Sequence, residues 1–303
     1  MPHVRRNANW NARMYRDEIL PMLDKMLKDG TNYDKILACG FHGYPQDKKL
    51  GLSYLDAYGA ILRDTKEDPW ARVAAAGALA YMNDSKSKSY PSEKYYMDAV
   101  KMITEERPLD RFGDVDWAIG GSVAKMCDDA FAAGLVGDIE IFYKAAIKLL
   151  NHKHQHPRGD GAKMLRGMPL EDFHRVADKV IHVIEDKDRT YHSYHSPGGP
   201  VGGWVSILAN LNIEEGITYA LGILNIKSGK GSFKLRAVMD ALAAYGGNAK
   251  ETVEQLKKED KWKKVPTNRK LKGNWNRMIK AIETDKSPKK MITFKEAKSA
   301  GRK

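Results

Sequence analysis

The sequence has few of the residues and patterns that define several common protein classes. It contains two cysteines, Cys39 and Cys127, in 303 residues, and neither belongs to a Cys-x-x-Cys pair. A disulfide framework is therefore excluded, and both thiols are expected to be free and buried. No apolar run approaches the roughly 20 residues that a membrane-spanning helix needs, and the first residues contain no apolar stretch typical of a signal peptide. These absences predict a protein without a membrane partner and, by default, a cytoplasmic location.

Patterns typical of β-strands are also scarce. No run alternates apolar and polar residues between turn residues, and the hairpin dipeptide Asn-Gly is missing. Apolar residues recur at helical spacing instead, for example in residues 19–27, 139–150 and 170–184. The sequence therefore predicts an all-α protein.

Four segments share a further pattern, in which small residues precede a leucine on the expected buried face. The segments are Asp68–Met82, His156–Met168, Ser196–Leu211 and Gly231–Gly246. The first three open with a residue followed by proline, which ends one helix and fixes the first turn of the next. Their leucines are 86, 43 and 34 residues apart, which leaves room for a further copy near residues 117–126. A period of about 40 residues with two helices is typical of stacked helical repeats.

The first of these segments resembles the second helix of a HEAT repeat. Asp68-Pro69, Arg72-Val73 and the small-residue run Ala74–Leu79 match that family's pattern best, and the other copies keep only parts of it. The resemblance covers roughly residues 50–250. It implies an α-solenoid of about five helix pairs, with an N-terminal cap helix at roughly residues 11–29. It implies little about function, because such folds carry many.

The net charge of +12 is concentrated at the C-terminal end. Residues 250–303 contain 18 Lys plus Arg and 7 Asp plus Glu, whereas residues 1–249 contain 33 and 32. We expect residues 1–249 to form the repeat domain and residues 250–303 a basic C-terminal helix and tail, partly disordered and largely so from Thr284 onward. Trp262 and Trp275 lie among the lysines, so this extension is a candidate contact for nucleic acid or another polyanion. A solubilising tail is the alternative.

Residues 190–200, TYHSYHSPGGP, carry the densest set of chemically versatile side chains. Histidine can act as a base or a ligand near neutral pH, and tyrosine can donate a proton. Tyr191, His192, Tyr194 and His195 also suit a carbohydrate groove, where rings stack and hydroxyl groups form hydrogen bonds. Three roles remain open for this loop: a structural connection, a ligand contact or catalysis.

A second histidine-rich stretch contains His152, His154 and His156. Alternating histidines share a face only in an extended chain, and a metal site there would use Asp160 as the nearest carboxylate. A solvated turn is the expected interpretation, with Arg158 pointing along the repeat groove.

Trp117 follows two aspartates, Asp114 and Asp116, in the stretch RFGDVDWAIGG. Helical-repeat DNA glycosylases combine a carboxylate with an aromatic face in a basic groove, but their full catalytic set does not map onto this chain. Asp114 also fits the N-cap of a helix, with Asp116 in its first turn.

We therefore expect a non-catalytic protein-binding or scaffold module whose concave face or loop edge contacts another protein. One alternative is an enzyme acting on carbohydrate or an anionic polymer through the loop at residues 190–200. A second is nucleic-acid binding, either through residues 250–303 or in the manner of a helical-repeat DNA glycosylase. No metal or cofactor is expected. The candidate ligand-binding residues are Tyr191, His192, Tyr194, His195, Arg158 and Trp117.

Overall fold

The computed structural model describes residues 16–42, 52–83, 91–106, 115–127, 130–153, 155–179, 200–225 and 231–300. Within these ranges every regular element is a helix, and a single isolated parallel bridge joins Ile213 to Ile292. The prediction of an all-α protein is confirmed. None of the described helices is long and apolar enough to cross a membrane.

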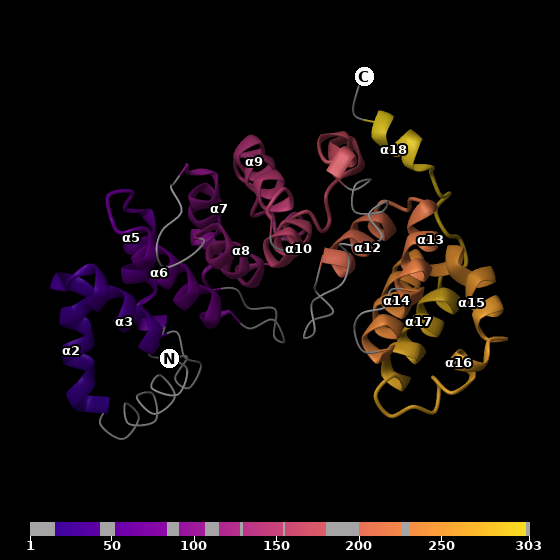
Figure 1. The fold of residues 1–303 in the computed structure, drawn as a ribbon, viewed down its shortest axis with the longest axis horizontal. Coiled ribbons are helices and arrows are strands. Elements are labelled where there is room, and N and C mark those ends of the chain that lie inside the picture. Colours follow the sequence, from indigo (N-terminus) through magenta and orange to yellow (C-terminus); the bar gives the residue numbers. More distant parts are fainter. Residues whose placement is uncertain are drawn as a thin grey trace. The chain divides into compact units, whose positions relative to one another are not determined.

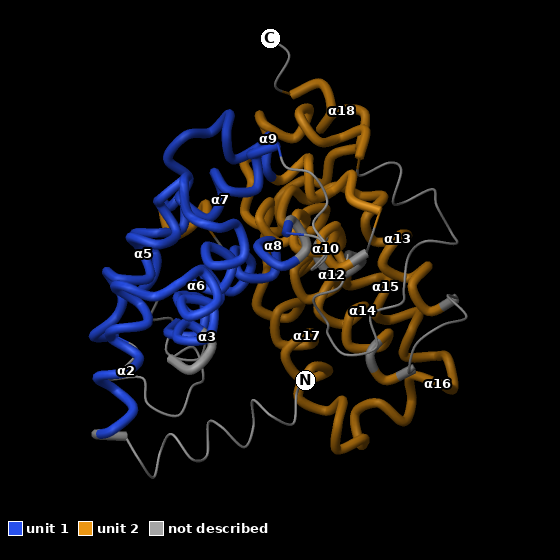
Figure 2. Tube along the Cα trace, turned by 60° about the vertical axis from the view of Figure 1, so that its left-hand side comes forward, with its two compact units in different colours: residues 1–128, 135–145 blue, residues 129–134, 146–303 orange. Residues whose placement is uncertain are grey.

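The chain divides into two compact units (Figure 2). Unit 1 comprises residues 1–128 and 135–145, and unit 2 comprises residues 129–134 and 146–303. This division differs from the expected boundary after residue 249, because the second unit continues across that point. The boundary between the units falls instead inside a helix, between residues 145 and 146.

The described part of unit 1 consists of helix pairs (Figure 1). Its elements are α2 (Arg16–Asp29), α3 (Asn32–His42), α5 (Leu55–Arg63), α6 (Pro69–Met82), η1 (Glu93–Tyr95), α7 (Tyr96–Thr104), α8 (Val115–Met126) and the first part of α9 (Ile139–Leu150). Helices α2 and α3, α5 and α6, and α7 and α8 pack as pairs. Helix α6 also packs against α3 and α8, so the second helices of successive pairs are neighbours.

The sequence of α6 suits its central position, because it has a well-formed N-cap and mostly small side chains. The Asp68 carboxylate accepts hydrogen bonds from the backbone N–H groups of Trp70 and Ala71, at 2.8 and 3.2 Å, and Pro69 fits the first turn. The side chains that face its neighbours are mostly alanines with almost no exposed surface. They are Ala71, Ala75, Ala76, Ala78 and Ala80. Small side chains allow three other helices to approach one helix closely.

Unit 2 begins with the last turn of α9 and continues to the C-terminal end of the described chain. Its other elements are α10 (Gln155–Met164), η2 (Leu170–Arg175), α12 (Pro200–Asn210), α13 (Glu215–Gly222), η3 (Ile223–Asn225), α14 (Gly231–Tyr245), η4 (Gly246–Ala249), α15 (Lys250–Leu256), α16 (Asp260–Lys263), α17 (Lys272–Thr284) and α18 (Phe294–Ser299). Helix α12 packs against α10 and α14, and α14 packs against α17. In unit 2, α10, α12, α14 and α17 therefore pack one against the next.

The repeated segments of the sequence coincide with these successive second helices. They map onto α6, α10, α12 and α14, and the expected extra copy maps onto α8. The spaced leucines have no exposed surface; they are Leu79, Leu165, Leu208 and Leu242. Each leucine therefore contributes fully to a helix–helix interface.

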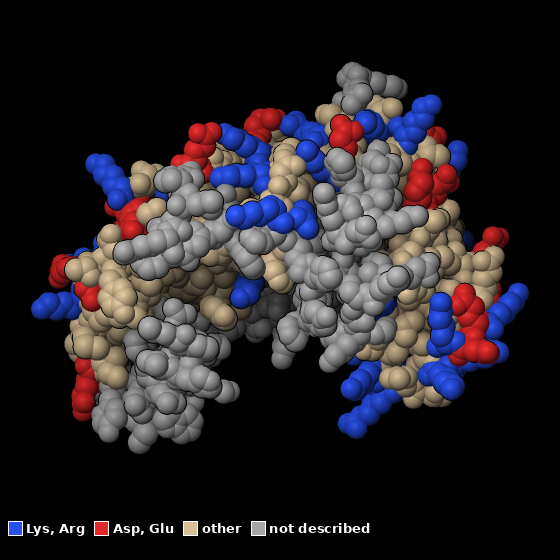
Figure 3. All heavy atoms as spheres, viewed as in Figure 1, with Lys and Arg blue, Asp and Glu red and all other residues tan. Residues whose placement is uncertain are grey.

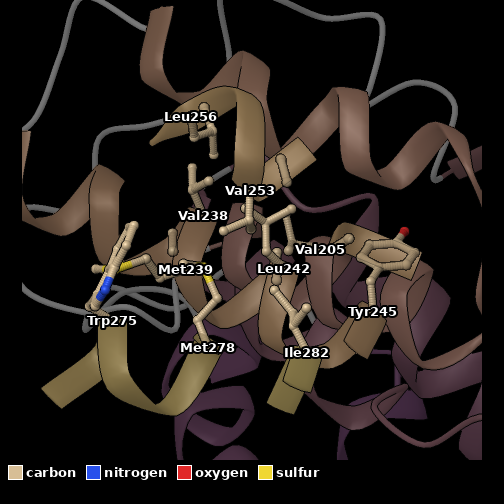
Figure 4. Close-up of a cluster of buried hydrophobic side chains, with 14 of the residues drawn as sticks. Val205, Val238, Met239, Leu242, Tyr245, Val253, Leu256, Trp275, Met278 and Ile282 are labelled. Atoms are coloured by element: carbon tan, nitrogen blue, oxygen red, sulfur yellow. The ribbon is translucent and has the colours of Figure 1, made fainter. Parts of the chain in front are cut away.

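The core of unit 2 includes residues on both sides of position 249 (Figure 4). Leu242 of α14 belongs to the same buried cluster as Trp262 of α16 and Trp275 and Met278 of α17. The Trp262 and Trp275 rings lie with their centroids 6.2 Å apart. Residues 250–284 are thus part of the folded unit, packed on the last repeated helix.

The segment after Thr284 also differs from the expected disordered tail. The backbone N–H of Ile292 donates to the Asn212 carbonyl at 3.1 Å, and the N–H of Glu214 donates to the Ile292 carbonyl at 3.0 Å. Helix α18 then begins with a capping box formed by Thr293 and Glu296. The tail is therefore held by backbone pairing to a turn about 80 residues earlier in the chain.

Candidate binding site

Most of the residues expected to bind a ligand lie outside the described ranges. Tyr191, His192, Tyr194 and His195 belong to the undescribed residues 180–199. Trp117 lies in helix α8, where the structure describes its backbone and not its side chain. The loop hypothesis, and the carbohydrate enzyme built on it, stays a prediction.

Arg158 is the expected ligand residue whose side chain is described. It lies in the first turns of α10, and its Nη1 donates to the carbonyl oxygens of His152 and Lys153, at 2.8 and 3.0 Å. Both carbonyls belong to the turn that follows α9, where backbone acceptors have no partner within the helix. Arg158 therefore connects the end of α9 to the start of α10.

The other residues of the histidine-rich stretch have separate surroundings. Asp160 is buried on α10 and pairs with Lys163 at 3.2 Å, while His156 is exposed. Gly161 lets α10 approach α9, because a Cβ there would lie 2.9 Å from the Ala146 carbonyl oxygen. Among the described residues, no group of three metal-ligating side chains converges.

Several pKa shifts in unit 1 have structural causes. Burial raises the pKa of the Cys39 thiol to about 12 and, together with a hydrogen bond to Asp24, raises the pKa of Tyr54 to about 12. Side-chain hydrogen bonds from Lys94 and Tyr95 hold the pKa of the Asp56 carboxyl below its ordinary value. The thiol and the phenol are therefore protonated and the carboxylate is charged near pH 7, states that suit packing and ion pairing.

Large apolar side chains are exposed in unit 1. Within the described ranges they are Met22, Tyr33, Leu52 and Tyr81, with Tyr33 the most exposed at 68%. The Lys125 ammonium group of α8 lies over the Tyr81 ring, 4.7 Å from its centroid, and this cation–π contact favours one orientation of the ring. Exposed tyrosines of this kind are typical of protein–protein contact surfaces.

Unit 2 contains a cavity of about 510 Å³ between η4, α15 and α17. Its apolar wall includes Val253 and Ile282, and its rim carries both lysines and carboxylates. Two of those carboxylates are already occupied: Glu254 pairs with Lys257 at 2.6 Å, and Asp285 accepts the N–H of Gly247 at 2.9 Å. Local contacts therefore compensate much of the charge around this cavity.

Lysines and arginines are concentrated in the sequence around the turn that joins α16 to α17, in the part of unit 2 at the lower right of Figure 3, where acidic side chains are drawn among them. Residues 261–280 contain eight Lys plus Arg and no Asp or Glu. Five of these cations are exposed and form no ion pair with the described residues. We call these five side chains the basic surface: Lys264, Arg269, Lys270, Lys272 and Lys280.

The basic surface was only partly visible in the sequence. The excess of lysine and arginine after residue 250 indicates a polyanion contact somewhere in the expected C-terminal helix and tail, but it does not place that contact at one turn. The absence of any acidic residue between positions 261 and 280 is the signal that locates the surface. That the surface belongs to a fixed turn depends on packing against α14, which no local pattern shows.

No family model, curated protein or solved structure matches the chain. The interpretation of its sites therefore depends on the residues and contacts described above.

Proposed function

We propose that the protein is a non-catalytic binding module, an α-solenoid of about five HEAT-like helix pairs that presents a surface to a partner protein. The observation that supports this best is the order of contacts among second helices. In unit 1 the order is α3, α6, α8, and in unit 2 it is α10, α12, α14, α17. Stacked repeats have this order, because each pair buries its apolar face on the next pair.

The exposed aromatic side chains of unit 1 are the candidates for contact with the partner. Tyr33 lies on α3 and Tyr81 on α6, two second helices that pack against each other. Tyrosine supplies a large apolar ring and a hydroxyl group, and it is enriched among residues that dominate binding energy. Tyr33 and Tyr81 are therefore the side chains that we assign to partner contact.

Site-specific photo-crosslinking tests this proposal. A photoreactive phenylalanine analogue is placed at position 33, at position 81 or, as a control, at the exposed position 101 of α7. In cells of the source organism, the first two positions should crosslink to the same protein and position 101 should not. The crosslinked protein is identified by mass spectrometry and then purified.

Calorimetric titration with that purified protein completes the test. The Tyr33→Ser/Tyr81→Ser variant should bind at least about tenfold more weakly than the unmodified chain, while Lys101→Ser/Lys144→Ser should bind as tightly. Exposed substitutions of this kind change stability little, so folding is retained. Equal binding by all three proteins, or crosslinks no different from those at position 101, would contradict the proposal.

A further inference from the structure

The basic surface is held in place by the core beneath it. Val265 and Leu271, which flank the turn between α16 and α17, are buried in the hydrophobic cluster of unit 2. The Arg236 guanidinium of α14 donates to the Lys270 carbonyl at 2.8 Å, and the Lys270 N–H donates to the Asn268 side chain at 2.9 Å. The backbone that carries the cations is therefore fixed, and only their side chains must be ordered on binding.

Three neighbouring acidic residues already pair with other side chains, whereas Glu283, three residues after Lys280 on α17, is exposed and forms no ion pair with the described residues. Lys261 pairs with Glu259 at 3.1 Å and Lys263 pairs with Asp260 at 2.8 Å. On the adjacent face, Asp240 of α14 accepts from both Arg277 and Asn274. The five cations of the basic surface thus remain available to an external anion without breaking an internal ion pair.

The side chains around the basic surface lack the aromatic and apolar anchors that several kinds of anionic partner use. None of the exposed large apolar side chains found in the described ranges lies between residues 250 and 300. Trp262 is fully buried and Trp275 is 8% exposed, so their rings are not platforms on which unpaired bases stack. The surface also lacks the aromatic anchors of protein interfaces and the apolar side chains that insert into a lipid surface.

Duplex nucleic acid requires none of these features. Its paired bases are stacked inside the helix, and its phosphates form a dense, regular array of charge that lysine and arginine neutralise with release of counterions. We infer that the basic surface binds the phosphate backbone of duplex nucleic acid without reading its base sequence. This activity is separate from the proposed protein contact, because it uses unit 2 and different side chains.

Fluorescence anisotropy with the full chain tests the inference. The probes are a labelled DNA duplex of about 20 base pairs and an RNA duplex of the same sequence, titrated between about 50 and 200 mM KCl. At least one duplex should bind, and its affinity should fall on the order of 10²-fold or more across this range, because four to five phosphate contacts give a steep salt dependence. The two probes show whether the helix geometry of DNA or of RNA is preferred.

A charge-matched pair of variants locates the site. Lys264→Gln/Arg269→Gln/Lys270→Gln/Lys272→Gln should reduce the magnitude of the slope of log affinity against log salt by about 3 to 4. The control, Lys25→Gln/Lys28→Gln/Lys101→Gln/Lys144→Gln, removes the same charge from exposed positions of unit 1 and should leave the slope nearly unchanged. Circular dichroism and thermal unfolding confirm that both variants are folded.

Three results would overturn the inference. The first is that neither duplex binds at about 50 mM KCl with protein up to about 100 μM. The second is that the two charge variants reduce the salt slope by the same amount. The third is that the protein sediments with phosphatidylserine vesicles through the same residues while neither duplex binds.

Discussion

Arg72 shows how much one residue of the repeat pattern contributes to the fold. Its Nε donates to the Leu62 carbonyl at 2.9 Å, and its two terminal nitrogens donate to the Glu105 carboxylate at 2.8 Å each. The arginine is 3% exposed. One side chain of α6 therefore fastens the end of α5 and the end of α7 together, which explains the use of arginine at this position.

Replacing Arg72 should destabilise the protein, because its hydrogen-bond partners would remain partly buried. We predict that Arg72→Ala lowers the free energy of unfolding by about 3 kcal/mol, and that Arg72→Lys lowers it by less, since lysine keeps the charge but not the two parallel bonds. The exposed pair of Arg63 with Asp98 is the control. Arg63→Ala should lower the free energy of unfolding by less than about 1 kcal/mol. Urea unfolding measures all three, and equal losses for Arg72→Ala and Arg63→Ala would contradict this role.

Two glycines of unit 1 have opposite expected effects when a methyl group is added. A Cβ at Gly59 would lie 2.0 Å from the Tyr95 ring, whereas a Cβ at Gly77 would meet nothing closer than the Ser122 Oγ at 3.9 Å. We predict that Gly59→Ala lowers the free energy of unfolding by about 1–3 kcal/mol through overpacking. Gly77→Ala should raise it by about 0.5–1 kcal/mol through helix propensity. Thermal unfolding distinguishes the two signs, and destabilisation by both substitutions would show that α6 packs more tightly than described.

At the scale of elements, the repeated helices and a C-terminal helix could be predicted from the sequence, whereas α18 could not. A helix is encoded locally, by the Asp68-Pro69 start of α6 and the alanines that follow it. Helix α18 depends on partners far away in the chain, such as Phe173, whose ring centroid lies 5.2 Å from that of Phe294. The spacing of apolar residues within residues 284–300 does not predict that contact.

The same limit applies to residues 170–184, where the spacing of apolar residues predicted one helix. The structure has a 3-10 helix, η2, at residues 170–175 directly after Pro169. Its residues also pack against α18. The structure therefore departs from one continuous α-helix at residues 170–176, while residues 177–179 are helical and residues 180–184 lie outside the described ranges.

Asn212 is one of the residues that attach the C-terminal segment. It has a φ of 57°, and its Nδ2 donates to the carbonyl oxygens of Lys289 and Lys290 at 2.7 and 2.9 Å. A left-handed backbone favours asparagine or glycine over other residues. The position therefore combines a backbone requirement with a side-chain requirement.

Two substitutions separate these requirements. Asn212→Gly keeps the backbone conformation and loses the side-chain bonds, so we predict a loss of about 1–2 kcal/mol; Asn212→Ala adds backbone strain and should lose about 1 kcal/mol more. In hydrogen exchange, the amide of Ile292 should exchange faster in both variants. Unchanged protection of that amide in both would show that Asn212 does not hold the segment.

At the scale of the whole molecule, charge was the most informative property of the sequence for function. It correctly located the cationic excess beyond residue 249, because net charge is a sum that needs no structure. It gave no information on which cations are free, since Asp240 neutralises Arg277 across 37 positions of the chain. The basic surface is therefore defined by two properties together: the local excess of cations in the sequence and the ion pairs that the fold forms.

The proposed binding module requires consecutive second helices to lie against each other through small residues. A disulfide between α6 and α8 tests this most directly, because the Ser122 Oγ, whose place a cysteine sulfur would take, is the nearest heavy atom to a Cβ built at position 77, at 3.9 Å. The native thiols, Cys39 and Cys127, are buried and should remain reduced. In Gly77→Cys/Ser122→Cys, mild oxidation of the folded monomer should give an intramolecular disulfide, seen by mass spectrometry after alkylation, whereas Gly77→Cys/Lys101→Cys should give none. A folded double variant that stays reduced, or that crosslinks only between molecules, would contradict the packing of these helices and the binding module proposed from it.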